Sequence, residues 1–410
     1  MRVAIVDGDI SFPATSGKRL RTLNLMLPLA KVHKLTYIAR NTALTDTREA
    51  SAFFADYGIE TVFVDDPLQI KRGPAFYSKL AGNVVSPLPY SVASHISADM
   101  RRVVSAYAAS RTIDLCQLEW SGYSYCLSYQ TAPVVLQAHN VDAVLWQRYE
   151  EAEKNPLKRW YISQQCRKFR TFENSAFHRA SRVVAVSAAD AAAARGLYGD
   201  LPIDVIDNGV DVAAYSRLQA NAAAKTILFL GALDWRPNLD ALEILLGEIF
   251  PLVRAVRPEA KLLIVGRNPP RWLRQRIENI ENATLSADVA DVRPYLAQSS
   301  VMAVPLRIGG GSRLKILEAL AAGLPVVSTS VGAEGLALTP GSEITLADTP
   351  QALADALLDS FVNSVAAQQQ AERGRTLVSK IYDWNTLADR LGSVWEYTIE
   401  NISRKPCQQM

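Results

Sequence analysis

Short apolar runs alternate with helical patterns from the first residues of the chain. RVAIVD (2–7) and KLTYIA (34–39) have the character of strands, and between them apolar residues recur at helical spacing, at Leu20, Leu23, Leu27 and Ala30. Further runs of the strand kind follow at TVFV (61–64), DLCQL (114–118), PVVLQA (133–138) and RVVAV (182–186). This alternation predicts a parallel sheet with crossover helices.

A second series of runs begins after a polar, alanine-rich stretch at 212–225, which we interpret as a linker. Its strands are TILFL (226–230), KLLIV (261–265), VMAV (301–304) and PVVS (325–328). We therefore predict two doubly wound α/β domains, with residues 1–215 in the first and 216–385 in the second. Ligands of such sheets bind beyond the carboxyl ends of the strands, so a ligand that reaches from one domain to the other is expected.

The segment 299–336 holds the strongest candidate for a binding site. A buried strand is followed by three glycines (309–311) and by a short helix that carries Arg313, Lys315 and Glu318. Glycine N–H groups and a helix N-terminus can converge on an anion, which predicts a phosphate-binding loop. Lys315 and Glu318 are three residues apart and share one side of the helix. The alternative is an ordinary glycine loop before an amphipathic helix with a surface charge pair.

Composition and missing motifs narrow the classes of function. Of the 410 residues, 49% are hydrophobic, and the net charge of +3 is too small to indicate nucleic acid. The four cysteines form no CxxC pair, which argues against a zinc site or a disulfide scaffold. GxGxxG after the first strand and GxxxxGK[ST] are absent, which argues against a dehydrogenase or a P-loop ATPase. Neither a leader pattern nor a membrane span is apparent, so we expect a cytoplasmic protein, with the inner face of the cell membrane as a further expected location.

Several segments resemble the GT-B glycosyltransferases, specifically the retaining family 4. They are PATSGKR (13–19), HNVD (139–142), DNGVD (207–211), FLGALDWRPNLDAL (229–242), LLIVG (262–266) and GGGSRLKILEALAAGLPVVSTSVGAEGL (309–336). The last of these is the specific match. The resemblance implies two Rossmann-like domains that face a central cleft, an acceptor domain first and a donor domain second. It also implies a C-terminal helix, at about 386–405, that crosses back to the first domain.

The resemblance carries over to individual residues. It implies that Glu318 holds the donor ribose, and that Arg313 and Lys315 contact the diphosphate. The family pattern has another glutamate where this chain has Gly310, which removes a carboxylate that often touches the transferred sugar. The expected donor-binding residues are Gly17, Gly231, Arg236, Gly266, Arg267, Gly310, Gly311, Ser312, Arg313, Leu314, Lys315 and Glu318.

The first domain supplies the expected acceptor side. The acceptor-binding candidates are Lys18, Glu119, His139 and Asn140, and the catalytic candidates are His139, Arg313 and Lys315. His139 follows a strand and resembles the family's histidine near the reacting centre; the alternative is a histidine that only bonds the backbone. Glu119 is either an acceptor ligand or base, or a helix N-cap. Glu334 is either a donor contact or a cap of its turn.

The implied reaction displaces a nucleoside diphosphate from an anomeric carbon. Charge grows on the leaving phosphate, where N–H dipoles and the two cations can stabilise it, so we expect neither a metal nor another cofactor. By resemblance, the anomeric configuration is retained. The proposed role is transfer to a glycan or lipid-linked acceptor in bacterial cell-surface polysaccharide biosynthesis. Alternatives are a GT-B-type sugar-nucleotide epimerase and a non-catalytic glycan- or nucleotide-sugar-binding protein.

Residues 154–182 are basic and aromatic, with eight lysines and arginines against the single acid Glu173. Such a helix suits an anionic membrane surface or a lipid-diphosphate acceptor. It equally suits a long helix with its aromatic side chains in the core and its charges in water. No nucleic-acid motif accompanies the stretch, so nucleic acid is not expected as a partner.

Overall fold

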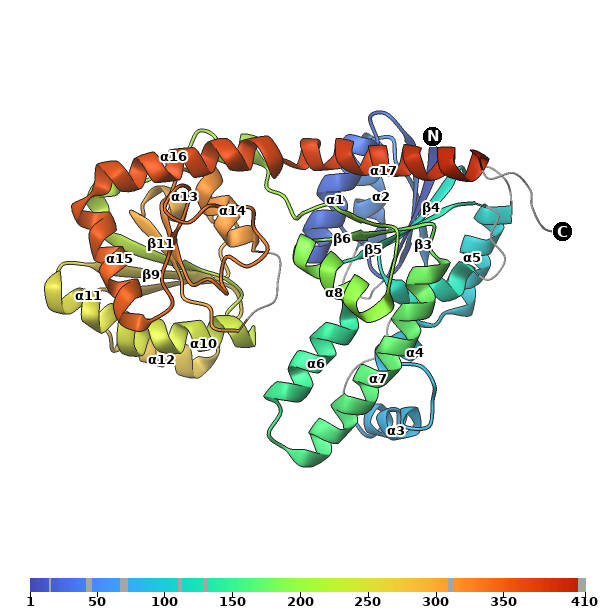
Figure 1. The fold of residues 1–410 in the computed structure, drawn as a ribbon, viewed down its shortest axis with the longest axis horizontal. Coiled ribbons are helices and arrows are strands. Elements are labelled where there is room, and N and C mark those ends of the chain that lie inside the picture. Colours follow the sequence, from blue (N-terminus) through green and yellow to red (C-terminus); the bar gives the residue numbers. More distant parts are fainter. Residues whose placement is uncertain are drawn as a thin grey trace. The chain divides into compact units, whose positions relative to one another are not determined.

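The computed structural model describes residues 1–14, 16–41, 46–66, 73–109, 113–127, 132–308 and 313–404. The chain divides into two compact units. The first contains residues 1–207 together with 387–410, and the second contains residues 208–386. The end of the chain therefore belongs to the same unit as its beginning (Figure 1).

The first unit is built on a seven-stranded parallel sheet. Its strand order is β3 (Glu60–Val64), β2 (Lys34–Arg40), β1 (Arg2–Asp7), β4 (Leu115–Leu118), β5 (Val134–Ala138), β6 (Arg182–Ala185) and β7 (Ile203–Val205). Its helices are α1 (Gly17–Leu29), α2 (Thr47–Asp56), α3 (Pro74–Asn83), α4 (Tyr90–His95), α5 (Ala98–Ala109), the 3₁₀ helix η1 (Ser121–Leu127), α6 (Asp142–Ala152), α7 (Pro156–Arg179) and α8 (Ala188–Tyr198).

The last helix, α17 (Trp384–Arg404), completes the first unit. Its apolar face is fully buried at Leu387, Leu391 and Trp395. The Trp395 ring lies 5.6 Å from the ring of His33, which follows α1, and the Trp395 indole N–H donates to Gln117 of β4. An amphipathic helix from the far end of the chain thus covers part of the first sheet.

The second unit is built on a six-stranded parallel sheet. Its strand order is β10 (Ala283–Ala287), β9 (Lys261–Gly266), β8 (Thr226–Leu230), β11 (Val301–Val304), β12 (Val326–Ser328) and β13 (Thr345–Leu346). Its helices are α9 (Val212–Tyr215), the 3₁₀ helix η2 (Ala222–Ala224), α10 (Arg236–Ile244), the π-helical turn η3 (Leu245–Ile249), α11 (Phe250–Val256), α12 (Arg271–Glu278), α13 (Arg293–Ala297), α14 (Leu314–Ala321), α15 (Pro350–Val362) and α16 (Ser364–Ile381).

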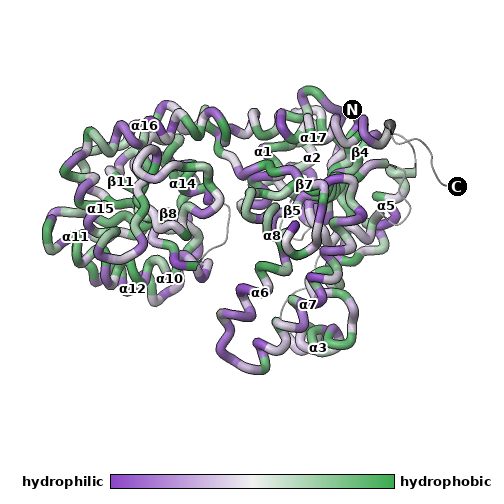
Figure 2. The backbone as a smooth tube through the Cα atoms, viewed as in Figure 1, coloured by the Kyte–Doolittle hydropathy of each residue, from purple (hydrophilic) through white to green (hydrophobic). Residues whose placement is uncertain are grey.

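Both sheets follow the predicted α/β pattern, because their central strands are apolar on both faces. Figure 2 colours each residue by its hydropathy, and hydrophobic and hydrophilic residues alternate along the helices, as amphipathic helices require. The sequence pattern does not predict β7, β10 and β13. All three are edge strands and only partly buried, so they lack the continuous apolar run that marks the inner strands.

The division between the units lies at Asp207 and Asn208, before the expected boundary at 215 and 216. Val210 donates its N–H to the carbonyl of Tyr382, and Val212 and Tyr215 pack against the core of the second unit. The stretch 212–225, which the sequence indicates as a linker, therefore lies within the second unit, because its apolar residues pack against the core of that unit.

The helices α6 and α7 form an antiparallel pair that extends from the first sheet (Figure 1). Its base is fixed by Glu173 of α7, whose carboxylate accepts the N–H groups of Asp142 and Ala143 at the first turn of α6. Phe169 and Phe177 of α7 are buried in the core. No helix in the described ranges carries an apolar stretch long enough to span a membrane.

Candidate functional site

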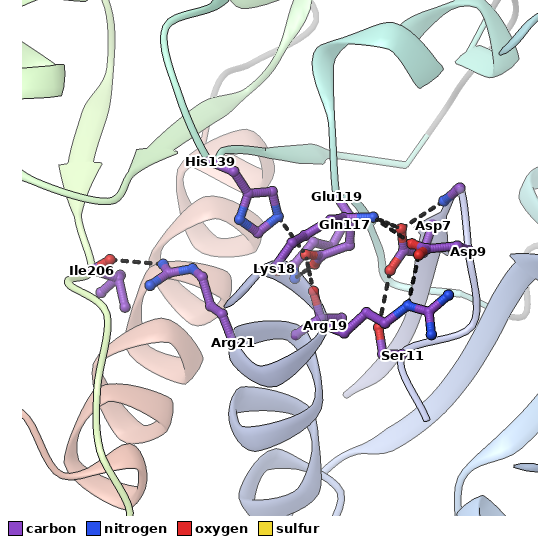
Figure 3. Close-up of polar contacts among 12 residues, drawn as sticks. Asp7, Asp9, Ser11, Lys18, Arg19, Arg21, Gln117, Glu119, His139 and Ile206 are labelled. Carbon is purple, nitrogen blue, oxygen red and sulfur yellow. Dashed lines mark hydrogen bonds and ion pairs between the residues drawn. The ribbon is translucent and has the colours of Figure 1, made fainter. Parts of the chain in front are cut away.

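The first group of polar residues lies at the carboxyl end of β1. Asp7 ends this strand, Asp9 follows it, and the amine of Lys18, in the first turn of α1, forms ion pairs with both carboxylates (Figure 3). The Arg19 guanidinium also pairs with Asp9, at 2.8 Å. The hydroxyl of Tyr37, from the neighbouring strand β2, lies 3.1 Å from the buried Asp7 carboxylate. Strand and helix ends therefore bring two acids and two cations together.

Burial and neighbouring charges act in opposite directions on the pKa values of this group. Burial raises the pKa of Asp7, although the charge of Lys18 opposes the shift. Burial also opposes the charge on Lys18, but the two carboxylates raise its pKa above the usual range. For Asp9, burial is outweighed by the charges of Lys18 and Arg19, which lower its pKa. Lys18 is thus held in its charged form by partners that the chain itself supplies.

The second group joins the carboxyl ends of β4 and β5. Glu119 follows β4 and is buried, and its carboxylate lies 3.1 Å from Nε2 of His139, which follows β5 (Figure 3). The Thr22 hydroxyl of α1 donates to the same oxygen at 2.8 Å, and the Gln117 amide donates to the other oxygen at 2.6 Å. Glu119 is therefore no helix N-cap. It holds a histidine at the edge of the sheet.

Burial alone would raise the pKa of Glu119. The hydrogen bond and charge of His139, the charge of Lys18 and the Thr22 hydrogen bond together lower that pKa to about 2. The Glu119 carboxylate is therefore ionised, and an ionised carboxylate only accepts hydrogen bonds, so the His139 nitrogen that faces it carries a proton. The other ring nitrogen can then act towards a bound molecule.

The third group lies in the second unit, after β8 and at the start of α14. Lys315 donates from Nζ to the side-chain oxygen of Asn238 at 2.8 Å, and its amine lies 5.2 Å from the ring centroid of Phe229. Gly231 lies beside it, and a Cβ at that position would lie 2.7 Å from the Asn238 amide nitrogen and 2.9 Å from Lys315 Nζ, so both side chains would have to shift. Gly266 is required to be glycine, since its Cβ would lie 1.9 Å from the Gly231 carbonyl oxygen, which is backbone.

Glu318 lies one helical turn beyond Lys315 and accepts a hydrogen bond of 3.2 Å from the Tyr215 hydroxyl. Burial raises the pKa of Glu318 to about 7. Burial likewise lowers the pKa of Lys315 to about 7, and the nearby charge of Arg313 acts in the same direction. Both groups therefore titrate near neutrality, where a bound anion or hydroxyl can change their charge.

Arg313 precedes α14 with a left-handed backbone, at φ 53°. Its guanidinium donates to the Val331 carbonyl at 2.8 Å and lies 3.5 Å from the Glu334 carboxylate. Glu334 thus pairs with Arg313 in the loop after β12. Arg313 is partly engaged by its own chain, beside Lys315.

The structure gathers some predicted residues and leaves others apart. Gly231, Arg313, Lys315 and Glu318 share one site in the second unit, and Glu119 and His139 share one in the first. Four predicted residues are exposed. Gly17 begins α1 and Arg236 begins α10, while Asn140 follows β5 and Arg267 follows β9. Leu314 begins α14 and is partly buried. Gly309, Gly310, Gly311 and Ser312 lie outside the described residues.

Sequence reasoning missed several residues of these groups. Those in the first unit are Asp7, Asp9, Thr22, Tyr37 and Gln117, and those in the second are Tyr215, Phe229 and Asn238. A signal was present for two of them, because Asp7 and Gln117 are polar residues in otherwise apolar strands, and buried polar groups need partners. Within the part of the chain that the structure describes, no group of three or more His, Cys, Asp or Glu is placed to hold a metal ion.

Two family profiles match the chain. One described as "Glycosyltransferase Family 4" matches residues 58–214, and one described as "Glycosyl transferases group 1" matches residues 224–363. A phosphatidyl-myo-inositol mannosyltransferase of Mycobacterium leprae is 32% identical over 200 residues, which are 47% of this chain and 51% of that protein. A GDP-mannose-dependent monoacylated alpha-(1-6)-phosphatidylinositol monomannoside mannosyltransferase of Corynebacterium glutamicum is 23% identical over 220 residues, 49% of this chain and 58% of that protein. The chain thus spans about half the length of these curated relatives.

Solved structures resemble the chain over nearly its full length. Anabaena HepE, in complex with UDP and glucose, has a TM-score of 0.66 at 14% identity and covers 97% of this chain and 100% of its own. WaaG, a glycosyltransferase involved in lipopolysaccharide biosynthesis, has a TM-score of 0.62 at 17% identity and covers 96% and 99%. At these identities the likeness is one of fold.

Proposed function

Because the chain belongs to the GT-B glycosyltransferases of the family 4 and group 1 type, we propose that it moves a sugar from a nucleotide-sugar donor to a glycan or lipid-linked acceptor with retention of the anomeric configuration. The transferred sugar is proposed to be a hexose, as the names of the mannosyltransferase relatives suggest. The proposed setting is bacterial cell-surface polysaccharide biosynthesis, in the cytoplasm or at the inner face of the cell membrane.

The donor site is proposed at the third group, and one observation carries the proposal. The Lys315 amine is held between Asn238 and the Phe229 ring beside Gly231 and Gly266, at the carboxyl ends of the central strands. A partly desolvated ammonium in this position interacts strongly with a diphosphate. Glu318, three residues along the same helix, offers carboxylate oxygens to ribose hydroxyls.

The proposed chemistry needs charge stabilisation more than proton transfer on the donor side. When the bond between the anomeric carbon and the β-phosphate breaks, negative charge grows on the leaving diphosphate. Lys315 and Arg313 can stabilise this charge together with backbone N–H groups, without a metal ion. Gly231 and Gly266 let the ends of two strands and the Lys315 amine pack closely together at this point.

The acceptor side is proposed at the second group. Glu119 fixes the His139 ring at the edge of the first sheet, and the free ring nitrogen is available to a sugar hydroxyl. Lys18 and Asn140 are proposed as further acceptor contacts. Since Lys18 is paired with Asp7 and Asp9, we expect it to act through this network rather than as an isolated cation.

A contact with an anionic membrane surface is proposed for the start of α7. Leu157 and Trp160 are 78% and 51% exposed there, next to the exposed Lys158 and Arg159. Glutamates at 150, 151 and 153 lie at the end of α6 and directly after it, and their negative charges oppose binding to an anionic surface. We therefore expect the apolar side chains to contribute more to binding than the charges. Further along the helix, Phe169 and Phe177 are buried in the core of the first unit, so these aromatic side chains are not available for such a contact.

The donor proposal is tested by thermal shift against a panel of nucleoside diphosphates and nucleotide sugars, with and without EDTA. A donor at about 100 times its Kd adds roughly 2.7 kcal/mol to the free energy of unfolding. We expect one nucleotide class to raise the Tm with or without EDTA, and this shift to be lost in Lys315→Met and Glu318→Gln. Lys261→Met, at an exposed lysine of the same unit, is the control.

Failure of every nucleotide to shift the Tm at millimolar concentration would contradict the donor proposal. Interconversion of a free sugar nucleotide without any acceptor would favour an epimerase instead. Anomeric retention is checked by NMR of the product once a donor is known.

The membrane proposal is tested by co-sedimentation with vesicles of phosphatidylcholine, alone or with phosphatidylglycerol. We expect binding to fall in the double variant Leu157→Ser, Trp160→Ser and to persist in Arg179→Ala, at the other end of the same helix. Equal binding by all three proteins would overturn it.

A further inference from the structure

A buried glutamine connects the proposed acceptor site to the end of the chain. Gln117 lies in the central strand β4, where every other residue is apolar, and it is almost fully buried. A polar side chain in such a strand costs free energy unless both ends of its amide are hydrogen-bonded. In Gln117 both ends are.

The two ends of the amide face different elements. Its oxygen accepts the indole N–H of Trp395, in α17, at 2.8 Å. Its nitrogen donates to the Glu119 carboxylate at 2.6 Å. The other oxygen of this carboxylate lies 3.1 Å from His139 Nε2. The side chains of Trp395, Gln117, Glu119 and His139 thus form one line of hydrogen bonds, which leads from α17 to the carboxyl ends of the strands.

The chemistry of the four groups allows one orientation of the amide. An indole N–H only donates, so it requires the amide oxygen on its side. The ionised carboxylate of Glu119 only accepts, so it requires the amide nitrogen on the other side. If the Trp395 N–H were absent, the buried amide oxygen would lose its donor, and the amide would be held against the Glu119 carboxylate from one end only.

We propose that Gln117 and Trp395 are positioning residues for the Glu119–His139 pair, so that the last helix of the chain sets the orientation of the proposed acceptor-site histidine. The expected effect on catalysis rests on the proposed function. The expected orientation of the His139 ring does not. Buried hydrogen-bonded lines of this kind restrict side chains more than single contacts do.

A matched control is available in the neighbouring strand. Gln137 of β5 lies two residues before His139 and is as buried as Gln117, but in the described part of the chain its amide has no hydrogen-bond partner. Gln137→Met therefore removes a buried amide without affecting Glu119. Gln117→Met removes the same chemical group from the line.

The experiment uses the full chain labelled with ¹⁵N-histidine, at one neutral pH. The sequence has only four histidines, so the His139 ring signals are assigned with His139→Gln. In the wild type we expect Nε2 to carry the proton. In Gln117→Met and Trp395→Phe we expect the two ring nitrogens to shift towards a mixture of tautomers, while Gln137→Met leaves them unchanged.

Kinetics supply the second readout. With the donor identified by thermal shift, kcat is expected to fall about tenfold or more in Gln117→Met, because a displaced catalytic group loses its alignment. The nucleotide-induced Tm shift should stay unchanged, since the proposed donor site lies in the other unit. Gln117→Glu is a second variant that keeps the shape of the side chain, and it should also disturb the His139 signals by placing a second carboxylate against Glu119.

Unchanged His139 ring signals in the folded Gln117 variants would overturn the inference. Altered ring signals in a protein that shows no transfer would instead support the positioning role and count against the proposed function.

Discussion

Glu119 keeps its charge in a place where burial opposes it. Three donors reach its two oxygens, and the neighbouring Lys18 adds a favourable charge. The result is a carboxylate whose ionised form is favoured more strongly in the folded chain than in the unfolded chain. Folding therefore becomes sensitive to protonation of this one residue.

The first prediction concerns acid stability. The folded pKa of Glu119 is about 2, below its ordinary value, so the stability that it contributes is present at neutral pH and is lost as the pH falls from about 5 to about 2. Across this range the wild type should lose up to about 3 kcal/mol more than Glu119→Gln. Urea unfolding at a series of pH values measures the difference. The exposed Glu49→Gln should keep the slope of the wild type, and equal slopes for Glu119→Gln and wild type would contradict the prediction.

The second prediction concerns proton uptake on donor binding. The pKa of Lys315 is lowered to about 7 without ligand, and a bound diphosphate favours the charged amine and raises this pKa. Nucleotide affinity should therefore decrease as the pH rises from 6 to 8, with protons taken up on binding. Calorimetry in two buffers of different ionisation enthalpy measures the uptake. Lys315→Arg, which stays charged, should take up fewer protons, and an unchanged uptake in this variant would assign the proton to another group.

At the scale of elements, the proposed donor site depends on the short distance between the ends of two neighbouring strands, β8 and β9. Gly266 ends β9 and Gly231 follows β8, and the backbone of one fills the space that a side chain of the other would need. The two glycines have no local turn pattern in common. They meet because adjacent parallel strands bring them to the same point, and glycine is required at 266 because the Gly231 carbonyl oxygen occupies the place of its Cβ.

The third prediction tests this close approach. Gly266→Ala should destabilise the second unit by about 1 to 3 kcal/mol and abolish the nucleotide-induced Tm shift, because its Cβ meets the Gly231 carbonyl and the backbone must move. Gly196→Ala is the control, because an added Cβ there meets nothing within 4 Å. In this exposed helical position alanine should stabilise by up to about 1 kcal/mol. Differential scanning calorimetry compares the two, and a nucleotide shift retained in Gly266→Ala would contradict the prediction.

At the scale of the whole molecule, the first unit is made from both ends of the chain. The side chains of Leu387, Leu391 and Trp395 are buried with segments that precede them by hundreds of residues, and the hydrogen bond between Gln117 and Trp395 joins residues 278 positions apart. Such contacts form only after the second unit has been synthesised. The first unit is therefore incomplete until the final helix is in place.

The fourth prediction is that a chain ending at Thr386 loses the native packing of its first unit. Removal of α17 exposes apolar side chains of α1 and leaves the Gln117 amide oxygen without its donor. We expect the near-UV circular dichroism of the first-unit aromatic residues to weaken while far-UV helix signals from the second unit persist. A chain ending at Arg404 is the control and should behave as the wild type. An unchanged near-UV spectrum after truncation at Thr386 would show that α17 is dispensable for the packing.

The sequence by itself determined what depends on local order. The alternation of apolar runs and helical patterns predicted the α/β class and the inner strands, and the strands at 301–304 and 326–328 are confirmed as β11 and β12. The resemblance of the chain to these glycosyltransferases is confirmed by the two family profiles, and the segment 309–336 lies within the match to the group 1 profile. Periodicity and motif spacing are properties of neighbouring residues, so they can be read without knowing the fold.

Only the tertiary structure decided which side chains meet. Edge strands such as β10 have too little apolar character to stand out, and no spacing rule links Asp7 to Tyr37 or Lys315 to Asn238. Gln117 was visible as a polar residue in a strand, but its partners come from α17 and from the loop after its own strand. Strand order and the return of the last helix bring these groups together, and both arise from packing between segments that are distant in the sequence.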